Sequence, residues 1–165
     1  MASSSRPRMS YQRMLRAIGA YLDGERPDRF RVIEVPDGFE IVVERHGQPP
    51  ELEEVHFSYE TVLEQAERLM RRRKLLGSRQ HSGWALTSTS RQDFLRALGY
   101  ELDDSRARFI LVDEIEGGVL VTYSYLDPAQ GFQWRKHMVH LKRDQIEAVL
   151  RSAYGRRNKR RLIRR

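Results

Sequence analysis

A ten-residue segment near the N-terminus recurs eighty residues later, and this recurrence constrains the fold more than any other feature of the sequence. Residues 14–23 read MLRAIGAYLD and residues 94–103 read FLRALGYELD, with six of ten positions identical. The identical pairs are Leu15/Leu95, Arg16/Arg96, Ala17/Ala97, Gly19/Gly99, Leu22/Leu102 and Asp23/Asp103. Self-similarity at a fixed spacing is the signature of an internal duplication. The chain is therefore predicted to consist of two related units.

Hydrophobic periodicity predicts the same series of elements in each unit. Apolar residues at helical spacing follow Ser10 and also follow Ser90, which opens a Ser-x-x-Asp capping signature. Runs of β-branched and aromatic residues around Asp37-Gly38 and Gly117-Gly118 predict hairpins of antiparallel strands. The first unit is predicted to contain helix 11–22, strands 30–35, 39–45 and 52–57, and helix 59–74. The second is predicted to contain helix 91–102, strands 109–115, 119–125 and 132–141, and helix 143–154.

Each unit thus has the order α-β-β-β-α, and the predicted fold class is α+β: a tandem duplication of this unit about an approximate twofold axis. In each unit an antiparallel three-stranded sheet is expected to carry its helices on one face. The strands of the second unit are apolar on both faces, because Ile110 and Val112 alternate with Phe109 and Leu111. A sheet covered on one side only should be polar on the other. The second face is therefore expected to meet the sheet of the other unit or of a second chain.

This pattern divides the chain into segments. They are a leader at residues 1–9 that is expected to be disordered, the first repeat at 10–74, a linker at 75–89, the second repeat at 90–154 and a basic tail at 155–165. Trp84 and Leu86 are expected to pin the linker to a core. Gly19 and Gly99 are expected to mark a close contact between helices. The Ser10 hydroxyl is expected to accept a hydrogen bond from a helix amide.

Composition excludes several classes of protein. The chain has no cysteine, which removes disulfides, thiolate catalysis and Cys-ligated zinc and fits a reducing compartment. It has no apolar run long enough to span a membrane, and its first residues lack the apolar core of a secretion signal. A soluble, cytoplasmic protein without a membrane span is expected.

Positive charge is concentrated at the C-terminus. The net charge is +7, and the last eleven residues contain seven basic residues and no acid, so the rest of the chain is neutral overall. Basic terminal arms commonly bind nucleic acid, and arginine forks suit phosphate. The candidate residues are Arg156, Arg157, Lys159, Arg160, Arg161, Arg164 and Arg165, with Arg71, Arg72, Arg73 and Lys74 at the end of the corresponding helix. The same tail could dock on an acidic protein or an anionic membrane, or serve only solubility.

The third strand of the second unit contains FQWRKH and interleaves aromatic with basic side chains. Exposed rings that stack on bases, beside cations that neutralise phosphates, bind single-stranded nucleic acid. Trp134, Arg135 and Lys136 are therefore candidate contacts. The alternative is that Phe132, Trp134 and Met138 form a core face of the strand while the basic residues face water.

No catalytic or metal site is predicted. The sequence has no nucleophile elbow, Walker loop, dinucleotide glycine pattern or His-Glu-x-x-His segment. His137 and His140 form a close pair, but their odd spacing sends them to opposite faces of a strand. Glu114 and Glu116 could bind a divalent cation, although charges beside a tight turn are usually solvated. The chain is expected to be a non-enzyme without a cofactor.

The order α-β-β-β-α resembles that of double-stranded RNA-binding domains, and the resemblance covers most of the chain at the level of element order. Such domains carry a lysine-rich start to the final helix. The second unit has Lys142 and Arg143 there, whereas the first has Ser58, Tyr59 and Glu60. The leading hypothesis is a non-enzymatic protein that binds DNA or RNA chiefly through its tail. The alternative is a protein-interaction or assembly module, such as a homodimer, that uses the apolar sheet face.

Overall fold

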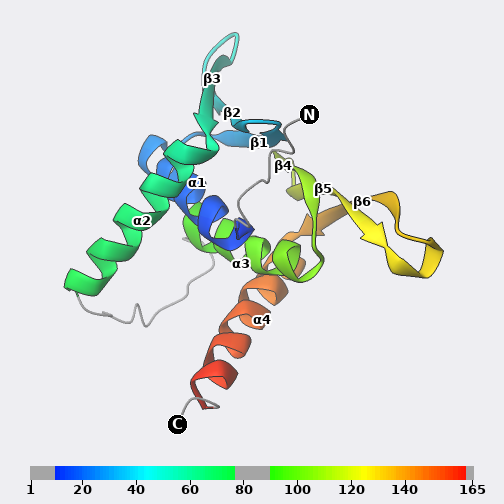
Figure 1. Cartoon of the computed structure of the whole chain (residues 1–165). Coiled ribbons are helices and arrows are strands. Elements are labelled where there is room, and N and C mark those ends of the chain that lie inside the picture. Colours follow the sequence, from blue (N-terminus) through cyan, green and yellow to red (C-terminus); the bar gives the residue numbers. More distant parts are fainter. Residues whose placement is uncertain (1–9, 77–89, 163–165) are drawn as a thin grey trace, which may run out of the picture.

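The computed structural model describes residues 10–76 and 90–162, with the side chains of all of these except 72–76 and 153–162. The first half contains α1 (Tyr11–Glu25), β1 (Arg29–Val35), β2 (Gly38–Arg45), β3 (Glu51–Ser58) and α2 (Tyr59–Leu76). The second half contains α3 (Arg91–Asp104), β4 (Arg108–Ile115), β5 (Gly118–Asp127), the short 3₁₀ helix η2 (Pro128–Gln130), β6 (Gln133–Lys142) and α4 (Arg143–Leu162) (Figure 1). Every predicted helix and strand is present. The largest change is at α4, which continues to Leu162 instead of ending at residue 154.

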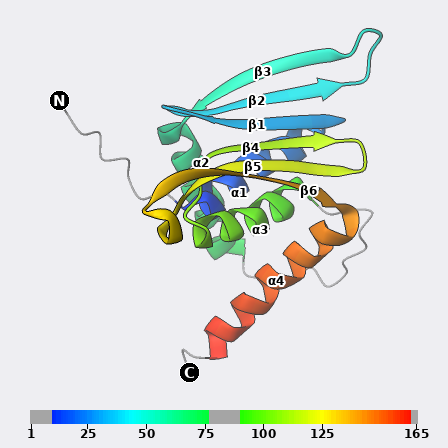
Figure 2. The same cartoon turned by 90° about the vertical axis from the view of Figure 1, so that its right-hand side faces the viewer.

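The strands form one six-stranded antiparallel sheet in the order β3-β2-β1-β4-β5-β6. The prediction of two three-stranded sheets is therefore wrong, and so is the expectation that one sheet covers the face of the other. The halves join edge to edge, because β1 pairs with β4 through Val32 opposite Val112 and Arg31 opposite Asp113. This pairing satisfies backbone groups that separate sheets would leave open at their edges. The helices all lie on one side of the sheet (Figure 2).

Helices α1 and α3 contain the repeated segment and pack against each other in opposite directions. A side chain at Gly19 would collide with the backbone of Gln92, and one at Gly99 would collide with the backbone of Gln12. These glycines are therefore points of close approach, which confirms the predicted helix contact. The two contacts are equivalent, since Gln92 follows Gln12 by the same eighty residues as the repeat.

The aspartate at the end of each repeated segment caps the opposite helix. Asp23 accepts hydrogen bonds from the backbone N–H groups of Arg91 (2.8 Å) and Gln92 (3.1 Å) at the start of α3. Asp103 accepts from the first two N–H groups of α1 at 2.7 and 3.2 Å. A carboxylate at a helix N-terminus pairs otherwise free N–H groups and interacts favourably with the helix dipole. These reciprocal bonds tie the two halves together.

The two serines before these helices behave differently. Ser90 accepts a hydrogen bond from the backbone N–H of Asp93 (3.1 Å), as its capping signature predicts. Ser10 accepts no amide, and its hydroxyl instead donates to Asp103 (2.6 Å). The prediction for Ser10 is wrong because its hydroxyl is turned to Asp103, while the N–H of Arg13, the counterpart of Asp93, bonds to the backbone oxygen of Ser10 alone.

The core lies between the helix pair and the sheet. Its largest fully buried side chains come from both halves and include Leu15, Ile18, Leu22, Phe39, Ile41, Leu95, Leu102 and Ile110. Glu34 accepts a hydrogen bond from the Tyr11 hydroxyl (2.6 Å), and burial together with this bond raises the pKa of Tyr11. Glu114 pairs with Arg91 at 3.2 Å, and burial raises the pKa of Glu114 in spite of that partner. These partly buried carboxylates thus receive donors beside the core.

Some predictions fall outside the described residues. They concern the leader at residues 1–9, Trp84 and Leu86 of the linker, and the tail beyond residue 162. Within the described ranges, no helix has the length and apolar character needed to cross a membrane.

Candidate nucleic-acid interface

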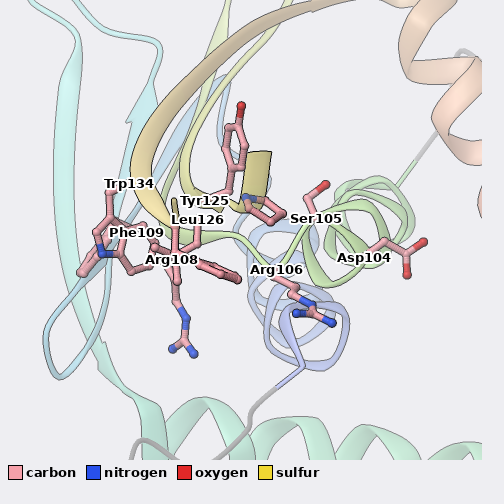
Figure 3. A pocket seen from close by; sticks show the side chains of 10 residues that line it. Asp104, Ser105, Arg106, Arg108, Phe109, Tyr125, Leu126 and Trp134 are labelled. Carbon is pink, nitrogen blue, oxygen red and sulfur yellow. The ribbon is translucent and has the colours of Figure 1, made fainter. Parts of the chain in front are cut away.

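A hollow opens where β4 begins and where β5 turns into β6 (Figure 3). Its volume is about 710 Å³, which is within the usual range for sites that hold small molecules. We call it the aromatic hollow. The residues that line it are Asp104, Ser105, Arg106, Arg108, Phe109, Tyr125, Leu126, Pro128, Phe132 and Trp134.

Large apolar side chains in the aromatic hollow remain open to solvent. The exposed fraction is 53% for Phe109, 69% for Phe132 and 54% for Trp134. Met138, further along β6, is 61% exposed. The interpretation in which Phe132, Trp134 and Met138 form a core face is therefore wrong. Val139 and Leu141 of β6 pack on the core, so Trp134 and Met138 at alternate positions lie on the opposite face of the strand. The hairpin of β5 and β6 also extends beyond the helices (Figure 1).

The backbone around the aromatic hollow is strained. In the described part of the chain, the non-glycine residues with left-handed φ are Arg26, Arg106, Phe109 and Phe132. The last three all line the hollow. Phe109 lies in a β-bulge, because the pairing of β4 with β5 slips between Arg108 and Leu111. Such conformations cost about 1–3 kcal/mol each and cluster at functional sites.

Cationic side chains border the rings. Arg106 and Arg108 line the hollow, and Lys136 follows two residues after Trp134 on the same face of β6. None of the three forms an ion pair with another described residue. Asp104 supplies the acidic group in the lining. The hollow and its border therefore combine aromatic surface with an excess of positive charge.

Arg135, predicted as a contact together with Trp134 and Lys136, is engaged within its own hairpin. Its Nε lies 3.3 Å from a carboxylate oxygen of Asp127, and its guanidinium also donates to the side chain of Gln130. Of the predicted contacts on β6, Trp134 and Lys136 thus lie at the hollow or its border, whereas Arg135 stabilises the turn.

Most of the basic C-terminal residues continue α4. The helix packs beside α3 through the buried Leu150 and the partly buried Ile146 and Val149. Beyond these positions it contains Arg151, Arg156, Arg157, Lys159, Arg160 and Arg161. Figures 1 and 2 show this end of α4 running away from the sheet. Arg164 and Arg165 lie outside the described residues.

The other predicted basic cluster ends α2. Arg71 is exposed and lies 3.6 Å from Glu67 of the same helix. Arg72, Arg73 and Lys74 belong to the helical backbone, but their side chains lie outside the described set. The lining of the aromatic hollow includes no residue of α2 or of α4. The structure therefore keeps the predicted contacts in separate places.

In the ranges that the structure describes, no group of three His, Asp or Glu side chains is placed to hold a metal ion. His137 and His140 lie in an unbroken ladder with β5, so they point to opposite faces, as predicted. Glu114, considered with Glu116 as a cation site, pairs instead with Arg91.

Comparison with protein-family models, with curated proteins and with solved structures finds no match to this chain. The resemblance in element order to double-stranded RNA-binding domains thus gains no support from a solved structure. The joined six-stranded sheet also departs from the separate three-stranded sheets expected for two such units. The evidence on function therefore lies in the sites themselves.

Sequence reasoning found Trp134 and Lys136 but missed Arg106, Arg108 and Phe109. The two arginines fall between predicted elements, and Phe109 looks like an ordinary apolar strand residue. One signal was available in the repeat. Phe109 stands where the first half has Arg29, so a ring replaces a charge at matched positions.

Proposed function

We propose that the chain is a non-enzymatic nucleic-acid-binding protein that holds the phosphate backbone of DNA or RNA chiefly through the basic end of α4. The observation that carries this proposal is that α4 continues to Leu162 while every charged residue after Glu147 is basic. We also propose that the protein is cytoplasmic, and that its halves arose by tandem duplication, on the basis of the six shared positions in the repeated segment.

The helical spacing of α4 supports this function. Ile146, Val149 and Leu150 pack beside α3, and the same three- and four-residue spacing leads on to positions 153, 157, 160 and 161. The last three of these positions are arginines. Arginines cannot continue an apolar contact with the body of the protein without burying charge. The end of α4 is therefore suited to a polyanion outside the molecule.

Truncation after Tyr154 tests this proposal. If the basic end engages about six phosphates, the slope of log affinity against log salt is about −5 for duplex DNA. Truncation should reduce the slope to near −1 and lower the affinity at least about 100-fold at low salt. The measurement is a fluorescence-anisotropy titration of single- and double-stranded DNA and RNA at two salt concentrations. An unchanged, salt-dependent affinity would contradict the proposal.

A full-length variant separates charge from helix length. Replacing Arg156, Arg157, Lys159, Arg160 and Arg161 with glutamine keeps the chain length and good helix formers. It should reproduce most of the effect of truncation, since only Arg164 and Arg165 of the basic residues after Tyr154 remain. The matched control replaces Arg71, Arg72, Arg73 and Lys74 of α2 with glutamine and should retain most of the affinity. Loss of binding on truncation without loss in the glutamine variant would show that charge is not the cause.

A second candidate function is assembly through the sheet face opposite the helices. That face carries Leu111 and Leu120, which are only partly buried, and no described element covers it (Figure 2). Light scattering of the purified protein tests this candidate. A dimer would favour it, and a strict monomer at high concentration would count against it.

A further inference from the structure

We propose that the aromatic hollow binds unpaired bases, so that the protein prefers single-stranded to double-stranded nucleic acid. This inference rests on the proposed function and adds a second site of different chemistry. The basic end of α4 attracts any phosphate backbone, because charge alone does not report whether the bases are paired. The hollow supplies the surface that distinguishes the two.

The aromatic hollow presents exposed ring surface on which bases can stack. Phe109 and Trp134 meet edge to face, with centroids 6.1 Å apart and planes at 63°. More than half of the surface of each residue is still exposed, so ring surface stays open for stacking. Every base has a π-face, which is why base stacking on aromatic side chains tolerates many sequences. A duplex keeps those faces inside its own stack, so only an unpaired base can use the hollow.

The strained backbone holds the rings of the aromatic hollow in place. The bulge and the left-handed φ of 54° at Phe109 bring its ring beside Trp134, outside the core. Phe132 also has a left-handed φ, of 59°, and its N–H donates to the backbone oxygen of Asp127 (3.0 Å). Strain of this kind persists where the surrounding structure holds it, and it is characteristic of preformed binding sites. The rings are thus held open before any ligand arrives.

Charge complementarity identifies the occupant. Arg106, Arg108 and Lys136 have no acidic partner among the described residues, and β6 contains no acidic residue at all. A single strand alternates planar bases with phosphates, and it needs rings and cations side by side. The hollow provides this combination. A neutral apolar peptide would use the rings but would leave the three cations without a role.

Two ring variants and a matched control test the inference. Stacking contributes about 1–3 kcal/mol per base, so Trp134→Ala and Phe109→Ala should each lower the affinity for a 16-nucleotide oligothymidylate about 5- to 150-fold. Their affinity for a 16-base-pair duplex should change less than about twofold, since α4 is intact. The control is Leu52→Ala, because Leu52 is 69% exposed on β3 of the first half. This variant should bind both ligands as the unaltered protein does.

Intrinsic fluorescence provides a second measurement that leaves the hollow intact. The chain has two tryptophans, so Trp84→Phe leaves Trp134 as the single reporter. Oligothymidylate should quench its emission with the same midpoint as the anisotropy titration, and the duplex should leave it unchanged. This titration tests base binding in the aromatic hollow even if Trp134→Ala or Phe109→Ala does not fold.

The outcomes separate the two proposals. Equal losses on single strand and duplex, or unaltered Trp134 emission at saturating oligothymidylate, would overturn the hollow as a base-binding site while leaving binding by α4 intact. Absence of nucleic-acid binding by the unaltered protein would overturn the proposed function and this inference with it. A selective loss on the single strand, with quenching, supports both.

Discussion

The two halves of the molecule share their interior and differ at matched ends of the sheet. In the first half, arginine–glutamate ion pairs and an aspartate–histidine hydrogen bond occupy the positions that correspond to the aromatic hollow. Arg45 lies 2.6 Å from both Glu25 and Glu53, and Asp28 lies 2.7 Å from His46. The hydrogen bond from His46 holds the pKa of Asp28 below its usual range. The charged groups at this end of the first half are therefore engaged with one another.

The second half replaces these residues with rings and cations. Eighty residues after Arg45 stands Tyr125, and eighty residues after Asp28 stands Arg108. The ion pairs of the first half cannot form with these residues. The second half therefore has exposed aromatic side chains and unpaired cations at the end of the sheet where the first half has paired charges.

The outer strands of the sheet carry opposite charges. β3 contains Glu51, Glu53 and Glu54 without lysine or arginine, whereas β6 contains Arg135, Lys136 and Lys142 without an acid. A polyanion is repelled by one edge and attracted to the other. The residues common to both halves therefore hold them together, and the residues that differ create the candidate site.

The largest expected change in stability is at the contact between α1 and α3, where Gly19 and Gly99 occupy equivalent positions in the two halves. Gly19→Ala and Gly99→Ala should each lower the free energy of unfolding by about 1–3 kcal/mol, because the added Cβ meets the backbone of the opposite helix. Urea denaturation measures the loss. The control is Gly24→Ala in α1, where an added Cβ meets nothing within 4 Å, and it should gain up to about 1 kcal/mol. A loss at Gly19 without a similar loss at Gly99 would break the equivalence.

The reciprocal caps should give the next largest effect. Asp23→Ala and Asp103→Ala should each cost about 1–2 kcal/mol of unfolding free energy, because each removes the acceptor for the first N–H groups of the opposite helix. The two sites share no partner, so the losses should add in the double variant. Thermal or urea unfolding measures this. A double variant no less stable than either single variant would show that the caps do not act independently.

The smallest expected change in stability comes from replacing Arg26 or Arg106, and these two replacements should differ in their effect on nucleic-acid binding. Arg26 and Arg106 both have φ of 51° and occupy matched positions after α1 and α3. Arg26→Gly and Arg106→Gly should each raise the unfolding free energy by at most about 1 kcal/mol, because glycine adopts this conformation without strain. Only Arg106→Gly should weaken binding of oligothymidylate in an anisotropy titration. Equal weakening by Arg26→Gly would remove the distinction between the halves.

Prediction from the sequence succeeded where local periodicity decides the outcome. The helices and strands, the α+β class and the close contact at Gly19 and Gly99 all depend on residues near in sequence or on the repeat. It failed for Ser10, whose hydroxyl donates to Asp103 of the other half and accepts no helix amide. It also missed the bulge at Phe109, because the pairing between strands, and not the apolar character of the residue, sets that conformation.

The amino-acid sequence by itself determined the two series of helices and strands, the close helix contact at Gly19 and Gly99, and the run of basic residues at the C-terminus. It did not show that Asp23 and Asp103 cap the opposite helices or that α4 continues to Leu162. Only the tertiary structure decided that β1 meets β4, so that two expected sheets became one, and that Trp134 lies outside the core. Periodicity reports which side chains favour burial. It does not report which surface is available to bury them, because that depends on backbone edges that are distant in the chain.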